Sequence, residues 1–470
     1  MNFFSKTLFL DQFTPVSIYE KAKVLYPKEL SFLFESTISS KNDGNFSYII
    51  IGARERIWYK NNECFFKDEK NKITKVDNNP LLFLKKYYKN FDKQIYKDKA
   101  KELGISLIDG FIGNVAYDIA KEFEKKLKPS MNSLKDELNI PDFDLIRPKI
   151  ILAFSHKTSK LTILTSMKSL KDEIENIENE LLKPYIYTPL KKAEIIDEGK
   201  FQFSKDEFFS MIEKAKEKIL CGDVFQLLMS NRFTQKAIVD HLSFYRALRS
   251  KNPSPYLYLL EFEDFSIAGS SPEVMVRLVD GHLLLRPIAG TRKRGSTLEK
   301  DLEMENELIN DKKERAEHLM LVDLGRNDIG RVARAGTVKV SDLMRIERYS
   351  HVMHIVSDVE AILDDKYDMF DLFMAVFTAG TMTGAPKIRA MELIAEFEGV
   401  KRNFYSGSVA YFGFDGNMDS AITIRTSFIT KDKIIFQAGA GIVADSNNED
   451  EYLEVQNKLA ANIATLKDLS

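Results

Sequence analysis

The sequence has few cysteines and histidines, no long apolar run and no excess of charge of either sign. Its two cysteines, Cys64 and Cys221, form no CxxC pair, which argues against a disulfide framework or a cysteine-based zinc site and suits a reducing cytoplasm. There is no run of about 18 apolar residues, the length that a transmembrane helix needs. Residues 1–13 lack the basic start and apolar core of a signal peptide. The formal net charge of −2 gives no indication of binding to nucleic acid or membrane, so we expect a cytoplasmic protein.

The length and the composition indicate a folded protein with more than one region. The chain has 470 residues, 44% of them hydrophobic and 29% charged, which is ordinary for a folded soluble protein. Strand hairpins mix with helices without strict βαβ alternation, which predicts an α+β fold. Residues 186–204 mix charge with turn residues, so we interpret them as a linker between an N-terminal region, 1–185, and a C-terminal region, 205–470.

The stretch Ala316–Asp328 combines a helix-like apolar run with a carboxylate. We expect it to be the second half of a helix that starts near Leu302 and is stopped by Gly325. Its apolar residues leave almost no polar face, so this half should be buried. The carboxylate of Glu317 would then need a cation or strong hydrogen-bond donors. The alternative is that Glu317 lies on the last solvated turn of an ordinary helix.

The last predicted helix carries acidic residues shortly after a loop of small residues. Glu451 and Glu454 lie three apart, on the face that also carries Lys458. The small residues Gly439–Gly441 would let backbone N–H groups approach a ligand closely. Together with Glu317, these glutamates would form an oxygen-only set suited to Mg²⁺, which takes one or two carboxylates and adds water and an anionic substrate. Glutamates near a helix start are also common because they interact favourably with the helix dipole.

Two polar side chains occur in strand-like runs. Arg425 lies within Ala421–Thr430, where its charge would be buried unless it meets an anion, and arginine binds carboxylates in a bidentate way. A structural salt bridge is the alternative. Strand alternation places His354 on the face opposite Met353 and Ile355. There it is either a hydrogen-bonded core histidine or a group that exchanges a proton near neutral pH.

The segment Ala379–Lys387, AGTMTGAPK, is only superficially similar to a phosphate loop. Its glycines are four apart and Lys387 stands third after Gly384, so it does not follow the GxxxxGK[ST] pattern. A nucleotide site is therefore disfavoured, whereas a backbone cradle for a carboxylate is compatible with the segment.

Six segments carry a resemblance to a known family. In chain order they are SSPEVMV (270–276), LLRPIAGTRKRG (284–295), AEHLMLVDLGRND (316–328), YSHVMHIVSDV (349–359), FTAGTMTGAPKIRAMELI (377–394) and QAGAGIVADS (437–446). In these segments the chain resembles the chorismate-utilising enzymes, and the resemblance extends over residues 205–465. It implies a β-sheet core with flanking helices and an N-terminal regulatory region packed on a C-terminal catalytic region.

Within this family the chain is most similar to the large subunits of anthranilate synthase. Ala289 stands in PIAGT, where the aminodeoxychorismate synthases have a lysine. Gln226 stands where isochorismate and salicylate synthases carry a lysine that activates water, so the resemblance favours ammonia as the nucleophile. The N-terminal segments PVSIYEKA, FLFES and FSYIIIG, together with NPSPYLY (252–258), resemble the tryptophan-feedback region of the anthranilate synthases.

The resemblance implies roles for individual residues. Glu317 and Glu454 match the family's metal ligands, with Glu451 close by. Glu273 matches the acid that helps the 4-hydroxyl leave, and His354 matches the histidine of the later pyruvate elimination. The matching chorismate-binding positions are Gly290, Thr291, Tyr405, Arg425, Gly439, Ala440 and Gly441. The matching tryptophan-binding positions are Ser36, Pro255, Tyr256 and Leu257, where leucine replaces the usual methionine at similar volume.

The implied reaction converts chorismate and ammonia to anthranilate and pyruvate with Mg²⁺. No cysteine of the chain stands in a strand–turn–helix setting with His and Glu downstream, so no glutaminase domain is expected. A separate glutamine amidotransferase subunit is therefore implied, and tryptophan is the implied feedback inhibitor. Two alternatives stay open, an aminodeoxychorismate synthase and a non-catalytic sensor of chorismate or tryptophan.

Overall fold

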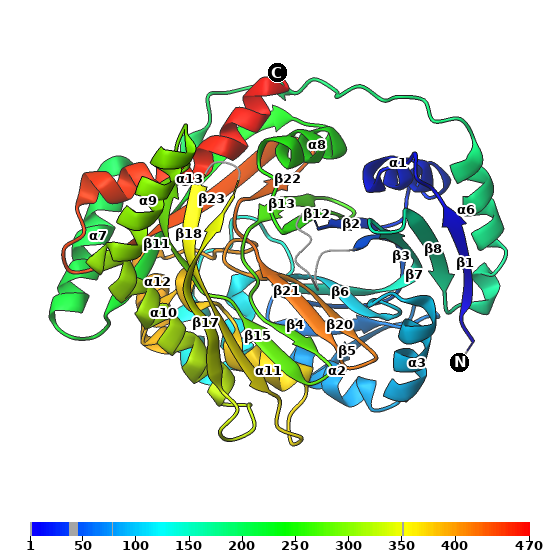
Figure 1. The fold of residues 1–470 in the computed structure, drawn as a ribbon, viewed down its shortest axis with the longest axis horizontal. Helices are drawn as coiled ribbons and strands as arrows, with labels where there is room; N and C mark the ends of the chain where they lie inside the picture. The colour runs from blue at the N-terminus through cyan, green and yellow to red at the C-terminus, as the bar shows by residue number, and fades with distance from the viewer. Residues whose placement is uncertain (1, 37–45, 78, 350–351) are drawn as a thin grey trace.

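The computed structural model describes residues 2–36, 46–77, 79–349 and 352–470, so Ser350 and His351 of the 349–359 segment lie outside the described residues. Helices surround a large network of antiparallel strands (Figure 1), which confirms the predicted α+β class. Both cysteines are free, as predicted. None of the described helices is long and apolar enough to cross a membrane.

The N-terminal region contributes the first eight strands and the first six helices of the described chain. Its strands are β1 (Phe4–Phe9), β2 (Ser31–Glu35), β3 (Phe46–Lys60), β4 (Glu63–Lys67), β5 (Ile73–Val76), β6 (Gly110–Val115), β7 (Phe143–Ser155) and β8 (Lys160–Thr165). Its helices are α1 (Pro15–Leu25), α2 (Pro80–Tyr88), α3 (Lys93–Leu103), α4 (Ala120–Phe123), α5 (Lys128–Met131) and α6 (Glu173–Leu182), with a short 3₁₀ turn, η1 (Tyr117–Ile119).

The linker and the C-terminal region contribute the remaining elements. The strands are β9 (Glu194–Ile195), β10 (Lys200–Phe201), β11 (Gln226–Ile238), β12 (Tyr256–Glu261), β13 (Ser266–Ser271), β14 (Arg277–Val279), β15 (His282–Leu285), β16 (Ile288–Lys293), β17 (Lys339–Arg348), β18 (Val352–Ile362), β19 (Gly384–Ala385), β20 (Ser408–Gly413), β21 (Met418–Ile422), β22 (Thr426–Ile429) and β23 (Lys433–Ile442). The helices are α7 (Lys205–Leu220), α8 (His241–Lys251), α9 (Leu298–Asn310), α10 (Lys312–Gly330), α11 (Met369–Val376), α12 (Lys387–Glu398) and α13 (Asn448–Asp468).

Strands of the two regions pair with each other. β2 pairs with β12, with Glu35 opposite Leu257, and β6 pairs with β20, with Val115 opposite Ser408. The hydrophobic cores are shared in the same way, because β2 and β12 each contribute buried side chains to both large core clusters. The N-terminal region therefore packs on the C-terminal region as part of one continuous sheet. The boundaries 1–185, 186–204 and 205–470 stay a prediction about the sequence.

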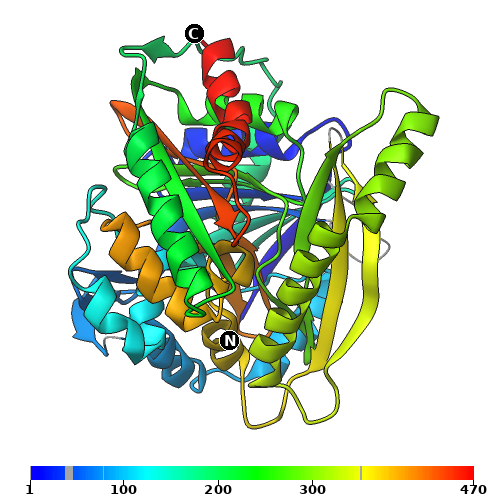
Figure 2. The same cartoon turned by 90° about the vertical axis from the view of Figure 1, so that its left-hand side faces the viewer.

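The long strand β11 organises the C-terminal region. It pairs along its length with β23 and at its start with β19. Helices α7 and α12 pack against β11, and α13 packs against β23. Figure 2 shows α7 (green) and α13 (red) on one side of the molecule and α9 and α10 (yellow-green) with β18 (yellow) on the other. The segments that carry the predicted site residues therefore approach one another from both sides.

The prediction of one continuous helix from Leu302 to Gly325 is wrong. The structure has two helices there, α9 and α10, with a break at Asp311. The side chain of Asp311 accepts hydrogen bonds from two backbone N–H groups of α10 and caps its start. A capping aspartate of this kind favours a new helix start over a continuous helix.

The same prediction is also wrong in ending the helix at Gly325 and in expecting all faces of its second half to be buried. Gly325 lies inside α10, where an added Cβ would come within 3.0 Å of Leu285 Cδ2, so this glycine serves close packing instead of helix termination. Leu319 is 44% exposed, whereas Leu321 and Val322 are buried. Helix α10 is therefore amphipathic and buries one face only.

The predicted strand Ala421–Thr430 is interrupted at Arg425. β21 ends at Ile422 and β22 begins at Thr426, because Arg425 has a φ of +52°, which a strand cannot include. Nη1 of Arg425 donates a hydrogen bond to the carbonyl oxygen of Lys458 at 2.6 Å. The break in the strand therefore directs Arg425 toward α13.

Candidate active site

The end of β23 lies against β11 so closely that only small residues fit. An added Cβ on Gly441 would lie 2.4 Å from Nε2 of Gln226, and one on Gly439 would lie 2.7 Å from the carbonyl oxygen of Met229. Real Cβ contacts are essentially never this short, so a larger residue at Gly439 would press on the backbone of β11, and one at Gly441 would displace the Gln226 side chain. The same added Cβ on Gly441 would lie 3.8 Å from Oε1 of Glu317. The glycine-rich end of β23, the start of β11 and helix α10 therefore meet at one place.

Carboxylates from α10 and α13 gather beside this strand end. Oε1 of Glu317 accepts a hydrogen bond from Nε2 of Gln226 at 3.1 Å. Burial raises the pKa of Glu317, and the negative charges of Glu314 and Glu454 raise it further. Glu454 forms an ion pair with Lys458 at 2.6 Å. Repulsion between nearby carboxylates is what a bound divalent cation relieves.

The donor set fits a hard cation such as Mg²⁺. Among the described residues no group of three or more His, Cys, Asp or Glu side chains could hold a metal ion. The candidate ligands Glu317 and Glu454 themselves present only carboxylate oxygens. That suits an ion that takes one or two carboxylates and fills its shell with water and substrate. Glu451 is buried, and its Oε1 already accepts a hydrogen bond from the Ser446 hydroxyl at 2.7 Å. Each of the three glutamates therefore already has a polar partner, and these contacts do not separate Glu451 from Glu317 and Glu454 as ligands.

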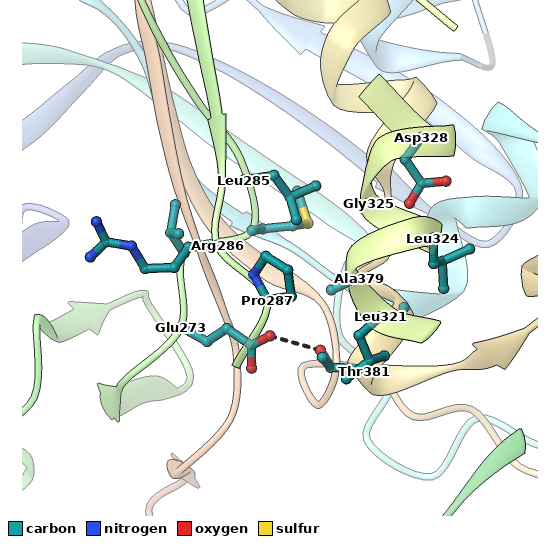
Figure 3. A pocket seen from close by; sticks show the side chains of 13 residues that line it. Glu273, Leu285, Arg286, Pro287, Leu321, Leu324, Gly325, Asp328, Ala379 and Thr381 are labelled. Atoms are coloured by element: carbon teal, nitrogen blue, oxygen red, sulfur yellow. Dashed lines mark hydrogen bonds between the residues drawn. The ribbon is translucent and has the colours of Figure 1, made fainter. Parts of the chain in front are cut away.

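Glu273 is a buried carboxyl group beside the 379–387 segment. The hydroxyl of Thr381 donates to its Oε1 at 2.8 Å, and Figure 3 shows the two side chains facing each other while Arg286 points away. Burial raises the pKa of Glu273 to about 7, an effect that the Thr381 hydrogen bond and the charge of Lys458 oppose. The small cavity between them, about 20 Å³, has room for about one water molecule. A carboxyl group in this state can donate a proton near neutral pH.

His354 is half-buried on β18 and contacts Gly290 and Thr291 of the neighbouring strand β16. Its Nδ1 lies 2.8 Å from the carbonyl oxygen of Gly290 and 3.1 Å from the hydroxyl of Thr291. Because the carbonyl can only accept, Nδ1 carries the proton and Nε2 is left with its lone pair. Burial lowers the pKa of His354, which keeps the ring neutral. The imidazole is therefore prepared to accept a proton at Nε2.

Arg425 and Tyr405 lie close together at the same site. Burial lowers the pKa of Arg425, while the nearby Tyr405 and Glu454 act in the opposite direction. Among the described residues no carboxylate forms an ion pair with Arg425, so the alternative of a structural salt bridge finds no support. Arg425 is half-buried, and a guanidinium in this position without a carboxylate partner is suited to bind an anionic group of a ligand.

The four predicted tryptophan-binding residues line one large cavity between the two regions. Ser36 comes from the end of β2, and Pro255, Tyr256 and Leu257 come from the start of the neighbouring β12. The cavity has a volume of about 1260 Å³ and also borders Glu35, which is buried. Backbone pairing of β2 with β12 brings the two segments together, although more than 200 positions separate them in sequence.

The segment 379–387 does not use its lysine to bind a ligand. Nζ of Lys387 donates to Asp328 at 2.5 Å and to the carbonyl oxygen of Val376 at 2.6 Å, and both charged side chains are buried. The segment instead contributes Thr381 to the site. These side-chain contacts do not test the predicted backbone cradle for a carboxylate, which stays a prediction.

The contacts that three polar residues make in the site were not predicted. Thr381 touches Glu273, Lys458 pairs with Glu454, and the side chain of Gln226 holds Glu317. The spacing of four between Glu454 and Lys458 was a usable signal for the second of these contacts. The other two join residues that lie far apart in sequence, so no local pattern could reveal them.

Comparison with known proteins defines the class. The family model described as chorismate binding enzyme matches residues 32–464, and the chain therefore belongs to this family. It is 40% identical to anthranilate synthase component 1 of Aquifex aeolicus (strain VF5), over 97% of this chain and 92% of that protein. Among solved structures it is similar to anthranilate synthase component I from Streptococcus pneumoniae TIGR4, with a TM-score of 0.77, 32% identity and coverage of 91% and 94% of the two chains.

Within the family, these full-length relatives place the chain in the anthranilate synthase component 1 branch, a branch of chorismate-utilising enzymes. The menaquinone-specific isochorismate synthase from Escherichia coli shares the fold, with a TM-score of 0.74 over 99% of this chain and 94% of that chain, at 17% identity. The predicted family resemblance is confirmed. The ligand of each predicted site residue stays a prediction.

Proposed function

We propose that the chain converts chorismate and ammonia to anthranilate, pyruvate and water, with Mg²⁺ as cofactor. The observation that carries this proposal is the pair Glu273 and His354. Glu273 has a pKa of about 7 and can donate a proton, whereas His354 is kept neutral with Nε2 free to accept one. Titratable groups held in opposite protonation states typically mark the acid and the base of a reaction.

The proposed chemistry assigns one task to each group. Glu273 protonates the 4-hydroxyl of chorismate as it leaves as water and ammonia adds at C2. His354 Nε2 then takes the C2 proton while the bond to the enolpyruvyl oxygen breaks, so the ring becomes aromatic and pyruvate is released after protonation. Arg425 and the backbone of Gly439–Gly441 hold a substrate carboxylate. Mg²⁺ held by Glu317 and Glu454 would neutralise charge on the substrate.

The nitrogen source provides the first test. The purified chain should form anthranilate from chorismate, ammonium and Mg²⁺, and it should form none when glutamine replaces ammonium, because we expect the glutaminase to be a separate subunit. At a fixed total ammonium concentration the rate should rise with pH up to about 7, since only free ammonia is nucleophilic, and should level off above that pH, where Glu273 loses its proton. Product mass identifies the reaction, because aminodeoxychorismate would retain the enolpyruvyl group. A chain that consumes no chorismate would instead be a sensor, and glutamine-dependent turnover would contradict the need for a partner subunit.

We further propose that tryptophan binds the large cavity and inhibits the enzyme. The Ser36 hydroxyl offers a polar contact for the amino acid head group, and Pro255, Tyr256 and Leu257 provide an apolar wall for the indole. The cavity borders strands of both regions, so a ligand there can favour an arrangement that binds chorismate poorly. Chorismate should then weaken tryptophan binding by the same factor, which calorimetry measures directly.

The variant Ser36→Phe provides the second test. A phenyl ring at Ser36 would fill the part of the cavity next to Pro255, so the tryptophan concentration for half-inhibition should rise at least about 100-fold, equivalent to roughly 2.8 kcal/mol of binding free energy. Activity without tryptophan should stay within about two-fold. Ser169→Phe is the matched control, because Ser169 is exposed in the N-terminal region and does not line the cavity. Unchanged sensitivity of Ser36→Phe would place the inhibitor site elsewhere.

A further inference from the structure

The loop that carries Tyr405 has an unusual backbone. It connects α12 to β20, and within it Asn403 and Ser406 have φ values of +53° and +62°. L-residues rarely adopt this left-handed conformation, and they keep it only where the surroundings fix them. Contacts from outside the loop would help to hold this conformation, above all at Ser406, since asparagine adopts positive φ more readily than serine.

The N-terminal region supplies these contacts. Oδ2 of Asp118 accepts a hydrogen bond from the backbone N–H of Asn403 at 2.7 Å, and the backbone N–H of Tyr117 donates to the carbonyl oxygen of Asn403 at 2.9 Å. Both backbone polar groups of Asn403 are thus bound by two consecutive residues of η1. Its side-chain Nδ2 also donates to Oδ1 of Asp136, at 3.1 Å.

Burying the Asp118 carboxyl group at this position costs folding free energy. Its side chain is 1% exposed, and its Oδ1 has no hydrogen-bond partner among the described atoms. The charged groups that influence it are Asp142, Lys401 and Lys121, and its pKa is raised to about 7, first of all by burial. A buried carboxyl with one oxygen unpaired does not stabilise a fold efficiently. A role in holding the Asn403 N–H explains why an acid occupies this position.

The same loop is tied to the catalytic side of the molecule through Arg402. Its guanidinium lies 4.9 Å from the ring centre of Tyr117 and 5.8 Å from that of Tyr405. Its Nη1 donates to the carbonyl oxygen of Met382 at 2.9 Å, next to the Thr381 that contacts Glu273. A shift of the loop at Asn403 would therefore displace the Tyr405 ring relative to the Glu273 side of the site.

We propose that Asp118 is a positioning residue for substrate binding, which acts by holding the Asn403 N–H and thereby fixing Tyr405 at the chorismate site. This proposal rests on the proposed function, because it takes Tyr405 as a contact of chorismate. Asp118 itself touches no substrate. Its effect should therefore appear in the binding of chorismate more than in the rate of the chemical step.

The test compares three substitutions of Asp118. Asp118→Ala removes the acceptor, Asp118→Leu fills the same space without an acceptor, and Asp118→Asn keeps an acceptor oxygen of the same reach. We expect KM for chorismate to rise about ten-fold in Asp118→Ala and Asp118→Leu, since a displaced contact group weakens positioning, with kcat within about three-fold. Asp118→Asn should restore KM to within about two-fold.

Two controls separate positioning from general destabilisation. Asp144 is equally buried in the N-terminal region but pairs with Arg56, so Asp144→Ala should lower the melting temperature without changing KM. In a Tyr405→Phe background, Asp118→Ala should have little further effect on KM if it acts through Tyr405. An unchanged KM in Asp118→Ala, or an equal rise in Asp144→Ala, would overturn the proposal. Failure of the proposed function is distinct, because the wild type would then form no anthranilate.

Discussion

Replacing Glu317 by glutamine should reduce the turnover of chorismate by about 1000-fold, equivalent to roughly 4 kcal/mol of transition-state stabilisation. The amide keeps the shape of the side chain but removes one of two charged ligands proposed for Mg²⁺. The fold should not suffer, because Glu317 is half-buried next to the negative charges of Glu314 and Glu454 and its own charge is unfavourable there without a cation. Without Mg²⁺, Glu317→Gln should therefore melt no lower than the wild type.

Metal binding gives a readout that does not depend on activity. Mg²⁺ should raise the melting temperature of the wild type, since a ligand that binds only the folded state stabilises it, and this rise should be lost in Glu317→Gln. Asp323→Asn is the matched control, because Asp323 is an acidic residue of the same helix whose side chain is 71% exposed and paired with Arg326. Near-normal turnover of Glu317→Gln at limiting Mg²⁺ would show that Glu317 is not a ligand.

The second large effect is expected for Glu273. Glu273→Gln should lower kcat by at least about 100-fold, because an amide cannot protonate the departing hydroxyl, and general acids typically contribute 100-fold or more. KM for chorismate should change little. Retention of normal turnover by this variant would exclude Glu273 as the proton donor.

The pH dependence follows from the state of the same carboxyl group. Glu273 must be protonated to act, and its pKa is about 7, so activity measured at a constant concentration of free ammonia should fall as the pH rises above about 7. The hydroxyl of Thr381 donates to the carboxylate and lowers this pKa. Thr381→Val should therefore move the falling limb to higher pH. A falling limb that stays in place in Thr381→Val would separate it from the ionisation of Glu273.

The sequence predicted most of what depends on short-range pattern. The strand alternation around His354 is present, since Met353 and Ile355 are buried while His354 is only half-buried on the other face. The predicted last helix is also present as α13, which begins soon after Gly439–Gly441 and carries Glu451 and Glu454. The helix that contains Ala316 differs from the prediction at both ends, because Asp311 caps a new helix start and Gly325 serves close packing inside the helix.

What the sequence could not predict depends on contacts between distant segments. Thr381 and Glu273 are 108 positions apart, and Gln226 and Glu317 are 91 apart. The break at Arg425 has no local signal either, since the flanking residues favour a strand. In the structure Arg425 leaves the strand conformation and donates a hydrogen bond to the carbonyl oxygen of Lys458 on α13. The family resemblance implied roles for Glu273, Glu317 and Arg425. The residues that contact them could be identified only from the structure.

The pairing of β2 with β12 and of β6 with β20 bears on how this chain could be divided. A protein split at the connecting segment 186–204 would leave β12 and β20 on one piece and β2 and β6 on the other. Each piece alone would then expose hydrogen-bonding strand edges and the apolar side chains that normally lie between them, which is a typical cause of aggregation. Neither half is thus a self-sufficient module, and two separately produced fragments would need to find each other while still incompletely folded.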